Sequence, residues 1–265
     1  MAFYLIAPAP MYHEKVAPAQ RLDGDETIGA PHCPPALVTC DNVPTIQLHS
    51  ERPAMTARLI VMDIDSTLIN QEVIDLLGEE AGVGGQVARI TERAMRGELD
   101  FKQALEERVG LLAGLDESVF ERTFERVTFT PGALELVRSA HSKGWKVGVV
   151  SGGFHEVADK IVAAAGIDFC LANRLEVVDG KLTGKLAADI VTKESKLIQL
   201  LDWAVECGVD MAHTVAIGDG ANDIPMIQAA GTGIAFCAKP KTREAAPFAI
   251  DERNLMLAMD IILRD

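Results

Sequence analysis

Polar residues able to do chemistry follow three apolar runs of the sequence, at the point where each run ends. The first run, residues 59–65, carries two carboxylates of its own, and a fully buried strand is a costly place to leave ionised acids. At the three ends lie Asp63, Asp65, Ser66 and Thr67, then Ser151, Gly152 and Gly153, and finally Asp219, Asn222 and Asp223. Ligands of open parallel sheets bind beyond the carboxyl ends of the strands. The sequence therefore predicts one shared site.

A bound cation is the simplest reason for several carboxylates to gather at one edge of a sheet. Crowded carboxylates raise one another's pKa values and destabilise the fold unless a cation lies among them. Oxygen ligands without histidine suit Mg²⁺, which keeps several waters and shares a phosphate. Asp63 and Asp65, two residues apart on an extended chain, are expected to project to the same face. The backbone carbonyl of Asp65 is then a candidate ligand, which leaves its side chain for another task.

Helix capping is a plainer explanation for single members of this set. An acidic residue at the start of a helix often only caps it, so capping is an alternative for Asp223, and the same holds for a serine such as Ser151. Capping does not explain why three strand ends all carry such residues, and the joint pattern favours a site.

Strand and helix patterns alternate along the chain from Ala57 onward. The strand-like runs are residues 59–65, 145–151, 213–219 and 231–236, and the helical patterns are residues 132–144, 155–166, 193–208 and 222–231. The strands are continuous apolar runs, as expected for a parallel sheet covered on both faces. The sequence thus predicts an α/β fold with a doubly wound parallel sheet. Residues 173–186, with Asp179-Gly180 between two β-type segments, predict a hairpin that interrupts the alternation.

The chain divides into three predicted parts. Residues 76–128 hold amphipathic helical stretches and no strand pattern, which predicts a small all-helical cap domain inserted after the first core strand. Residues 56–75 and 129–265 form the predicted core. Residues 1–55 hold eight of the twelve prolines, which argues against long helices and indicates a proline-rich N-terminal arm without an assigned function.

Composition excludes several classes of protein. The chain has 39 acidic and 25 basic residues, a net charge of −14, so a nucleic-acid partner is not expected. Five cysteines without C-x-x-C spacing predict neither a disulfide framework nor a zinc site. No apolar run reaches transmembrane length, and the start lacks the basic region of a signal peptide, so we expect no membrane partner and a cytoplasmic protein. The oligomeric state stays open, a homodimer included.

Four stretches of the sequence resemble a known family. DIDSTLI at 63–69 is similar to the D-x-D-x-T signature of the haloacid dehalogenase-like phosphohydrolases, VVSGGF to their second motif and GDGAND to their fourth. The predicted helical insert lies where such enzymes carry a cap. Within the family, ERAMRGELDF, ERVGLL and TVAIGDGANDIPMI are similar to members that hydrolyse O-phosphoserine, and the resemblance spans roughly residues 56 to 250.

The resemblance implies a role for each residue of the catalytic set. Asp63 is the expected nucleophile and Asp65 the expected general acid and base. Lys196 is the expected basic residue beside the phosphoryl group, because KLIQLL opens a helix at the appropriate distance before GDGAND, and Lys193 is its rival.

The resemblance also implies a metal site. Mg²⁺ is expected to bind the side chain of Asp63, the backbone carbonyl of Asp65, and Asp219. Asp223 is expected behind these ligands, where it orients Lys196 or a metal-bound water.

Substrate binding is implied for a further set of residues. Ser151 and the backbone near Gly152 are expected to bind the phosphoryl group, with Asn222 in contact with phosphate or substrate. Glu72 is expected to pair with the serine ammonium and Arg108 with its carboxylate. The implied reaction is Mg²⁺-dependent hydrolysis of O-phospho-L-serine to L-serine and phosphate, the last step of serine biosynthesis, through an aspartyl-phosphate. On the sequence alone, Glu72 and Arg108 are equally explained as a first-turn acid of a helix and an exposed helical charge.

Other classes of function fit the pattern less well. A receiver module of a signalling pair also combines acidic residues, Mg²⁺ and a phosphorylated aspartate, but usually on different strands and without a helical insert. A binding protein without catalysis is disfavoured because each catalytic position holds a competent residue. The remaining alternative is a phosphatase or phosphotransferase of the same family that acts on another small phosphomonoester.

Overall fold

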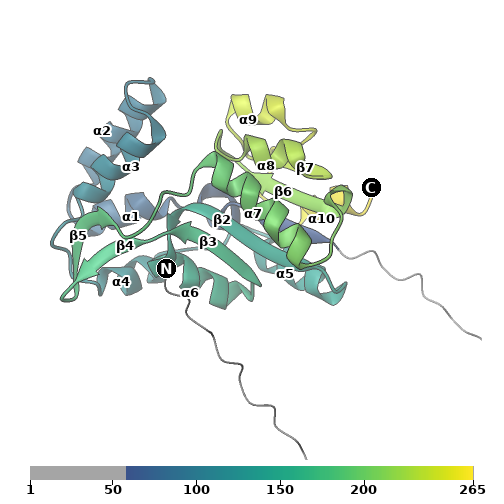
Figure 1. Ribbon diagram of the computed structural model, residues 1–265, viewed down its shortest axis with the longest axis horizontal. Coiled ribbons are helices and arrows are strands. Elements are labelled where there is room, and N and C mark those ends of the chain that lie inside the picture. Colours follow the sequence, from purple (N-terminus) through teal and green to yellow (C-terminus); the bar gives the residue numbers. More distant parts are fainter. Residues whose placement is uncertain (1–57, 265) are drawn as a thin grey trace, which may run out of the picture. The chain divides into compact units, whose positions relative to one another are not determined.

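The computed structural model describes residues 58–264 (Figure 1). The predicted N-terminal arm, together with Cys33 and Cys40, lies outside the described residues. Within the described range the other three cysteines are free thiols, in agreement with their spacing. The same range contains no helix that is long and apolar enough to cross a membrane.

The core of the fold is a six-stranded sheet in which all neighbouring strands are parallel. In spatial order the strands are β3 (Phe169–Asn173), β2 (Lys146–Phe154), β1 (Leu59–Met62), β6 (Thr214–Gly218), β7 (Thr232–Phe236) and β8 (Phe248–Ile250). The chain extends the sheet from β1 through β2 to β3, and then returns to the other side of β1 for β6, β7 and β8. This reversal confirms the predicted doubly wound sheet, and ligands bind beside such a switch point.

Helices cover both faces of the sheet because side chains of each strand alternate between two apolar cores. The helices are α5 (Ala133–Ser142), α6 (His155–Ala165) and α10 (Leu257–Ile262) on one face, and α7 (Lys193–Glu206) and α8 (Ile224–Ala229) on the other. Ile60 and Met62 of β1 pack on the first face, and Leu59 and Val61 pack on the second. All four are completely buried, which explains why β1 is a continuous apolar run.

Four helices and no strand lie between β1 and β2 in the chain. They are α1 (Val73–Glu80), α2 (Gly84–Met95), α3 (Phe101–Gly110) and α4 (Val119–Glu125). The start of α3 is a capping box, in which the Asp100 side chain accepts from the Gln103 N–H and the Gln103 side chain accepts from the Asp100 N–H. The all-helical insert is therefore present. Because α1 begins at Val73, the predicted boundary at residue 76 falls inside a helix.

The path of the chain after β1 differs from the prediction. The strand was expected to continue to Asp65, but it ends at Met62, and Ile64–Leu68 forms a helical turn. Asp63 is still extended, and its backbone N–H donates to the Ile217 carbonyl of β6 over 3.0 Å. Its side chain then accepts from the Ile64 N–H, and Ser66 takes a φ of 55°. The expected alternation of Asp63 and Asp65 along one strand is thus wrong, because a side chain to backbone bond turns the chain between them.

The predicted hairpin is confirmed as β4 (Leu175–Val178) and β5 (Lys181–Leu186), an antiparallel pair apart from the main sheet. Its turn residues Asp179 and Gly180 both have positive φ angles, as a two-residue hairpin turn requires. Strands β3 and β8 and helices α10 and α9 (Pro240–Ala245) were not predicted. These are short elements, and β8 has only three residues, too few for a periodic pattern.

Candidate active site

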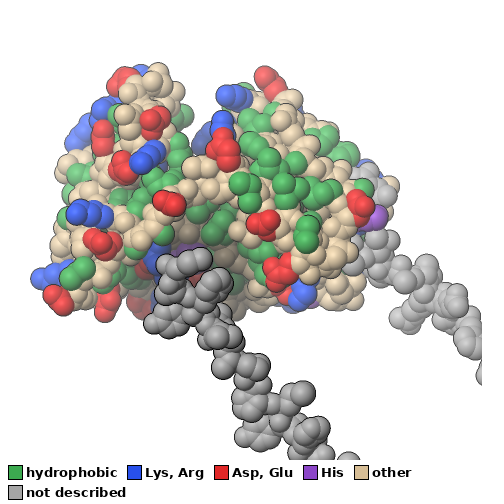
Figure 2. All heavy atoms as spheres, viewed as in Figure 1, with side chains coloured by type: hydrophobic (Ala, Val, Ile, Leu, Met, Phe, Trp, Pro, Cys, Tyr) green, Lys and Arg blue, Asp and Glu red, His purple; other side chains and the backbone are tan. Residues whose placement is uncertain are grey.

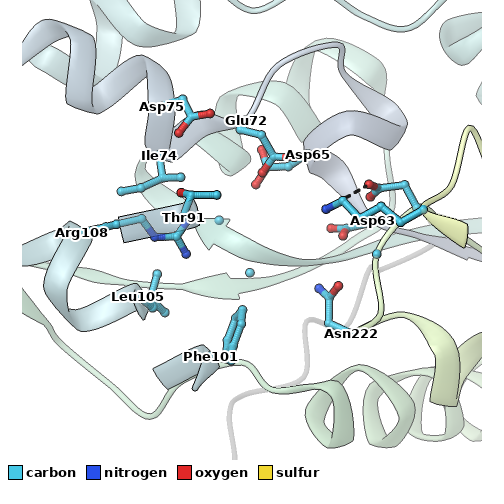
Figure 3. Close-up of a pocket in the computed structure, with 15 residues that line it drawn as sticks. Asp63, Asp65, Glu72, Ile74, Asp75, Thr91, Phe101, Leu105, Arg108 and Asn222 are labelled. Carbon is cyan, nitrogen blue, oxygen red and sulfur yellow. Dashed lines mark ion pairs between the residues drawn. The ribbon is translucent and has the colours of Figure 1, made fainter. Parts of the chain in front are cut away.

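A cavity of about 350 Å³ lies at the carboxyl ends of β1, β2 and β6, between the sheet and helices α1 to α3 (Figure 3). Its lining residues are Asp63, Asp65, Glu72, Ile74, Asp75, Thr91, Phe101, Leu105, Arg108, Gly152, Gly153, Asp219, Gly220, Asn222 and Lys239. Residues from all three predicted strand ends are thus brought together. Ser151 lies directly behind the lining, where it is buried and its Oγ accepts from the Gly153 N–H over 2.8 Å.

A buried lysine links two carboxylates at the floor of this cavity. Lys196 Nζ lies 2.7 Å from Asp63 Oδ2 and 2.6 Å from Asp223 Oδ1, and its side chain is 1% exposed. Lys193, the rival position, is exposed and pairs with its neighbour Glu194. The two lysines are three residues apart on α7, and the fold turns only Lys196 toward the end of the sheet.

Electrostatics within this group favour a charged lysine. Burial opposes the charge on Lys196, but the carboxylates of Asp223 and Asp63 outweigh burial and raise its pKa. Burial also raises the pKa of Asp63 well above its usual value, an effect that Lys196 partly offsets. The pair is therefore held together by attraction between groups that have no water around them.

Asp223 begins α8 but does not cap it. Its side chain makes no hydrogen bond to the helix, and instead accepts from Lys196 Nζ and, over 2.9 Å, from the Gly220 N–H. Gly218 leaves the room for it, since a Cβ there would lie 2.4 Å from the Asp223 carboxyl carbon. The helix-capping alternative for Asp223 is thus wrong in this structure.

The donor set of the cavity fits a hard divalent cation. Oxygens of Asp63, Asp219 and Asp223 lie within 4.8 Å of one another, and all three residues are buried. Burial, and then the charge of Asp223, raise the pKa of Asp219 to about 6. Three carboxylates thus face a single buried lysine, and carboxylate oxygens without histidine or thiolate are ligands that Mg²⁺ accepts.

Asp65 occupies a different environment from Asp63. Its Oδ1 accepts from the Val73 N–H at the start of α1 over 3.1 Å, and burial, followed by the charge of Glu72, raises its pKa to about 7. A carboxyl group with this pKa is half protonated near neutral pH. It can therefore both donate and accept a proton under ordinary conditions.

The raised pKa of Asp65 predicts how stability depends on pH when metal is absent. Between the usual value of 3.8 and about 7, the folded protein binds the Asp65 proton more tightly than the unfolded chain does. Its free energy of unfolding therefore falls as the pH rises through this window, by on the order of 4 kcal/mol from this group. Urea unfolding in EDTA at pH 4 and pH 8 should show that the wild type loses this much stability relative to Asp65→Asn, which does not titrate. A difference that stays flat or grows with pH contradicts the assignment.

Gly153 keeps Asp65 in position. A Cβ at Gly153 would lie 2.9 Å from Asp65 Oδ2 and 3.1 Å from Ser151 Oγ, too close for either atom to stay in place. We expect Gly153→Ala to lower kcat/KM for phosphomonoester hydrolysis about 10- to 100-fold by displacing the carboxyl group. Gly85→Ala on α2 is the matched control, because its nearest neighbour would be 3.9 Å away. Equal activity of the two variants would count against this role of Gly153.

Glu72 and Arg108 face the same cavity from the helical insert (Figure 3). Glu72 precedes α1 without capping it, and its Oε1 accepts from the Ser66 hydroxyl over 2.7 Å. Arg108 is half-buried, and its Nε donates to the Ala104 carbonyl of its own helix over 3.1 Å. Burial lowers the pKa of Arg108, while Asp75 and Glu72 favour its charged form. The cavity thus offers an anionic and a cationic group on the wall opposite Asp63.

Several residues of the site were not predicted. Asp75 and Thr91 line the cavity, and Asp75 could have been found because it lies one helical turn from Glu72. Lys239 follows β7, with Nζ 4.0 Å from Asp219 Oδ2, and no sequence signal marks it. Asn173 is buried behind the cavity, where its side chain donates to the Gly152 carbonyl and accepts from the Val191 N–H, each over 2.8 Å. It joins the end of β3 to the segment before α7.

The approach to the cavity is basic. A second hollow of about 600 Å³ adjoins it between the start of α3 and the start of α9, and shares Phe101, Gly220, Asn222 and Lys239 with it. Its lysines are Lys102, Lys193, Lys239 and Lys241, against two acids, Asp100 and Glu194. Figure 2 shows this face hollowed between the part formed by α2 and α3 and the part near α9, with basic side chains along the walls. On a chain of net charge −14, such an entrance attracts a small anion.

The sequence model of the haloacid dehalogenase-like hydrolases matches residues 60–228, and the chain belongs to this family. A phosphoserine phosphatase of Streptococcus thermophilus is 60% identical over 204 residues, which are 77% of this chain and 95% of that protein. A phosphoserine phosphatase of Lactococcus lactis is 51% identical, over 77% and 94% of the two chains.

Solved structures agree with these sequence relatives. A phospho-aspartyl intermediate analogue of phosphoserine phosphatase superposes with a TM-score of 0.73 at 43% identity, covering 78% of this chain and 99% of the other. A substrate-bound phosphoserine phosphatase complex superposes with a TM-score of 0.74 at 43% identity, covering 78% and 98%. Family membership excludes the receiver-module alternative.

Proposed function

We propose that this chain hydrolyses O-phospho-L-serine to L-serine and inorganic phosphate, the reaction that yields serine in its biosynthesis. The observation that carries the proposal is one cavity with Asp63 and Lys196 at its floor and with Glu72 and Arg108 on the opposite wall. A phosphoserine molecule has a phosphate at one end and an ammonium and a carboxylate at the other, so its three charges match these three positions. The phosphoserine phosphatases among the relatives support this substrate.

Asp63 is the proposed nucleophile. One of its carboxylate oxygens attacks the phosphorus in line, so an oxygen–phosphorus bond forms while the bond from phosphorus to the serine oxygen breaks. Protonated Asp65 donates its proton to the departing serine oxygen. It then takes a proton from the water that attacks the aspartyl-phosphate, which releases phosphate and restores Asp63.

Charge neutralisation is the other requirement, because an anionic nucleophile is repelled by a phosphate dianion. Lys196 is proposed to contact the phosphoryl oxygens, with Asp223 holding it in place. Asp63, Asp219 and the backbone carbonyl of Asp65 would hold Mg²⁺, which supplies further positive charge to the phosphoryl group when bound. Ser151, the backbone of Gly152 and Asn222 are proposed to bind the remaining phosphoryl oxygens.

The helical insert is proposed as a cap over this site, with residues 76–128 as the cap and residues 56–75 and 129–265 as the core. Arg108 and Phe101 reach the cavity from α3, so the site is complete only while α3 lies over the sheet. Closure of such an insert would exclude water from the aspartyl-phosphate until the leaving serine has taken its proton.

A comparison of substrates tests the proposed function. Phosphate release from O-phospho-L-serine should depend on Mg²⁺, stop in EDTA, and exceed release from O-phosphoethanolamine, which lacks the carboxylate, by about 10- to 100-fold in kcat/KM. Arg108→Ala should remove most of this preference, while Lys102→Ala, an exposed cation on the same helix, should leave it intact. Similar turnover of both substrates and of p-nitrophenyl phosphate would keep the chemistry but indicate a phosphatase for another phosphomonoester.

A further inference from the structure

The β4–β5 hairpin belongs to the core in sequence but pairs with the helical insert. It is inserted between β3 and α7, yet it hydrogen-bonds to the loop that follows α3. The Gly114 N–H donates to the Leu182 carbonyl over 2.8 Å, and the Leu182 N–H donates to the Leu115 carbonyl over 2.9 Å. The Glu117 N–H donates to the Gly180 carbonyl over 2.9 Å. The loop after α3 therefore runs along β5 as an additional, irregular strand.

Side chains extend this contact to α3 itself. Leu182 is buried in the same apolar core as Val109 and Leu112 at the end of α3. The pairing of β4 with β5 is irregular between Leu175 and Val177, and Gly184 on the opposite strand has a φ of 80°. A Cβ at Gly184 would lie 2.9 Å from the Ala113 Cβ and 3.2 Å from the Gly110 carbonyl oxygen. The absence of a side chain at Gly184 thus allows β5 to touch the end of α3.

The other end of the hairpin is tied to the core. The Leu175 N–H donates to the Glu156 side chain of α6 over 3.2 Å, and the Ala187 N–H donates to the Arg174 carbonyl over 2.8 Å. The hairpin is thus held at its base by the core and along β5 by α3 and the loop behind it. Figure 1 shows β4 and β5 reaching from β3 toward the helices of the insert.

The position of α3 decides where Arg108 lies. Arg108 is two residues before Gly110, and its Nε is bonded to the Ala104 carbonyl of the same helix. The guanidinium therefore moves with α3 and is not free to compensate for a shift of the helix. We propose that the β4–β5 hairpin is a positioning element for substrate recognition, which sets the location of Arg108 through its contact with the end of α3. This inference rests on the proposed function, in which Arg108 binds the substrate carboxylate.

Gly184→Ala tests the inference, because the added methyl group must displace the end of α3. The measured quantity is the preference ratio, defined as kcat/KM for O-phosphoserine divided by kcat/KM for O-phosphoethanolamine. We expect Gly184→Ala to lower this ratio about tenfold or more through the term for O-phosphoserine, with kcat/KM for O-phosphoethanolamine changed less than about twofold. In the Arg108→Ala background, Gly184→Ala should cause no further fall in the ratio, because both changes act on one contact.

The control is Gly166→Ala, which imposes similar backbone strain at a φ of 71° with no atom within 4 Å of the new Cβ. Its ratio should equal that of the wild type. Leu182→Val is a milder second variant for the case that Gly184→Ala does not fold, and it should lower the ratio in the same direction.

Two results overturn the inference while the proposed function stands. One is an unchanged ratio in the folded hairpin variants, and the other is a parallel loss for both substrates, which indicates a general structural role. A wild-type ratio near one, or an Arg108→Ala ratio equal to that of the wild type, instead overturns the proposed role of Arg108, and the inference fails with it. The wild-type and Arg108→Ala measurements thus separate the two failures.

Discussion

Asp63→Asn is expected to abolish phosphate release, with kcat reduced by at least about 10⁴-fold, because an amide cannot form the aspartyl-phosphate. Asparagine has nearly the same shape as aspartate, and Lys196 keeps its 2.6 Å contact with Asp223. The variant should therefore fold. Since burial already raises the pKa of Asp63, replacement by a neutral group should not lower the free energy of unfolding severely.

The measurement combines steady-state phosphate release with trapping of the acyl-phosphate. Acid quenching of the wild type during turnover, followed by treatment with hydroxylamine, should yield a hydroxamate at Asp63, and Asp63→Asn should yield none. Asn222→Asp serves as a control for a changed polar group in the same cavity, because it leaves the proposed nucleophile in place. Activity of Asp63→Asn above about one hundredth of the wild type would show that another group is the nucleophile.

Lys196→Met is expected to damage both stability and activity. Its removal leaves Asp63 and Asp223 buried with no cation between them, and loss of one partner of a buried ion pair costs about 3 to 5 kcal/mol. The loss of positive charge at the phosphoryl group should lower kcat by a further factor of about 10³. The pKa of Asp63 should also rise, because Lys196 is the group that lowers it in the wild type.

Lys193→Met is the matched control for this variant. Lys193 lies on the same helix but is exposed and paired only with Glu194, so the free energy of unfolding should change by less than about 0.5 kcal/mol and kcat should not change. Urea unfolding and phosphate release, both measured with saturating Mg²⁺, distinguish the two lysines. Similar effects of the two substitutions would contradict the assignment of Lys196. Partial recovery of Lys196→Met stability at low pH would support it, since protonation removes the uncompensated charges.

The main elements of the core could be predicted because their sequence signals are local. Residues 59–62 form a strand because four apolar residues in a row are buried on both faces of a sheet. The helical insert was predicted from its amphipathic periods, and the hairpin from Asp179-Gly180. The turn after Met62 was missed because it depends on one hydrogen bond from the Ile64 N–H to the Asp63 side chain, and an apolar pattern contains no sign of such a bond.

The sequence by itself determined the fold class and the three strand ends that meet in the cavity, because buried parallel strands and the residues beyond them have a strong one-dimensional pattern. Only the tertiary structure decided between Lys196 and Lys193, since both begin α7 and which of them is buried depends on how α7 packs against the sheet. It also decided that Asp223 faces Lys196 rather than capping α8, and that β5 touches the end of α3 near Arg108. These contacts join residues far apart in the chain, and their geometry follows from packing, which no local pattern specifies.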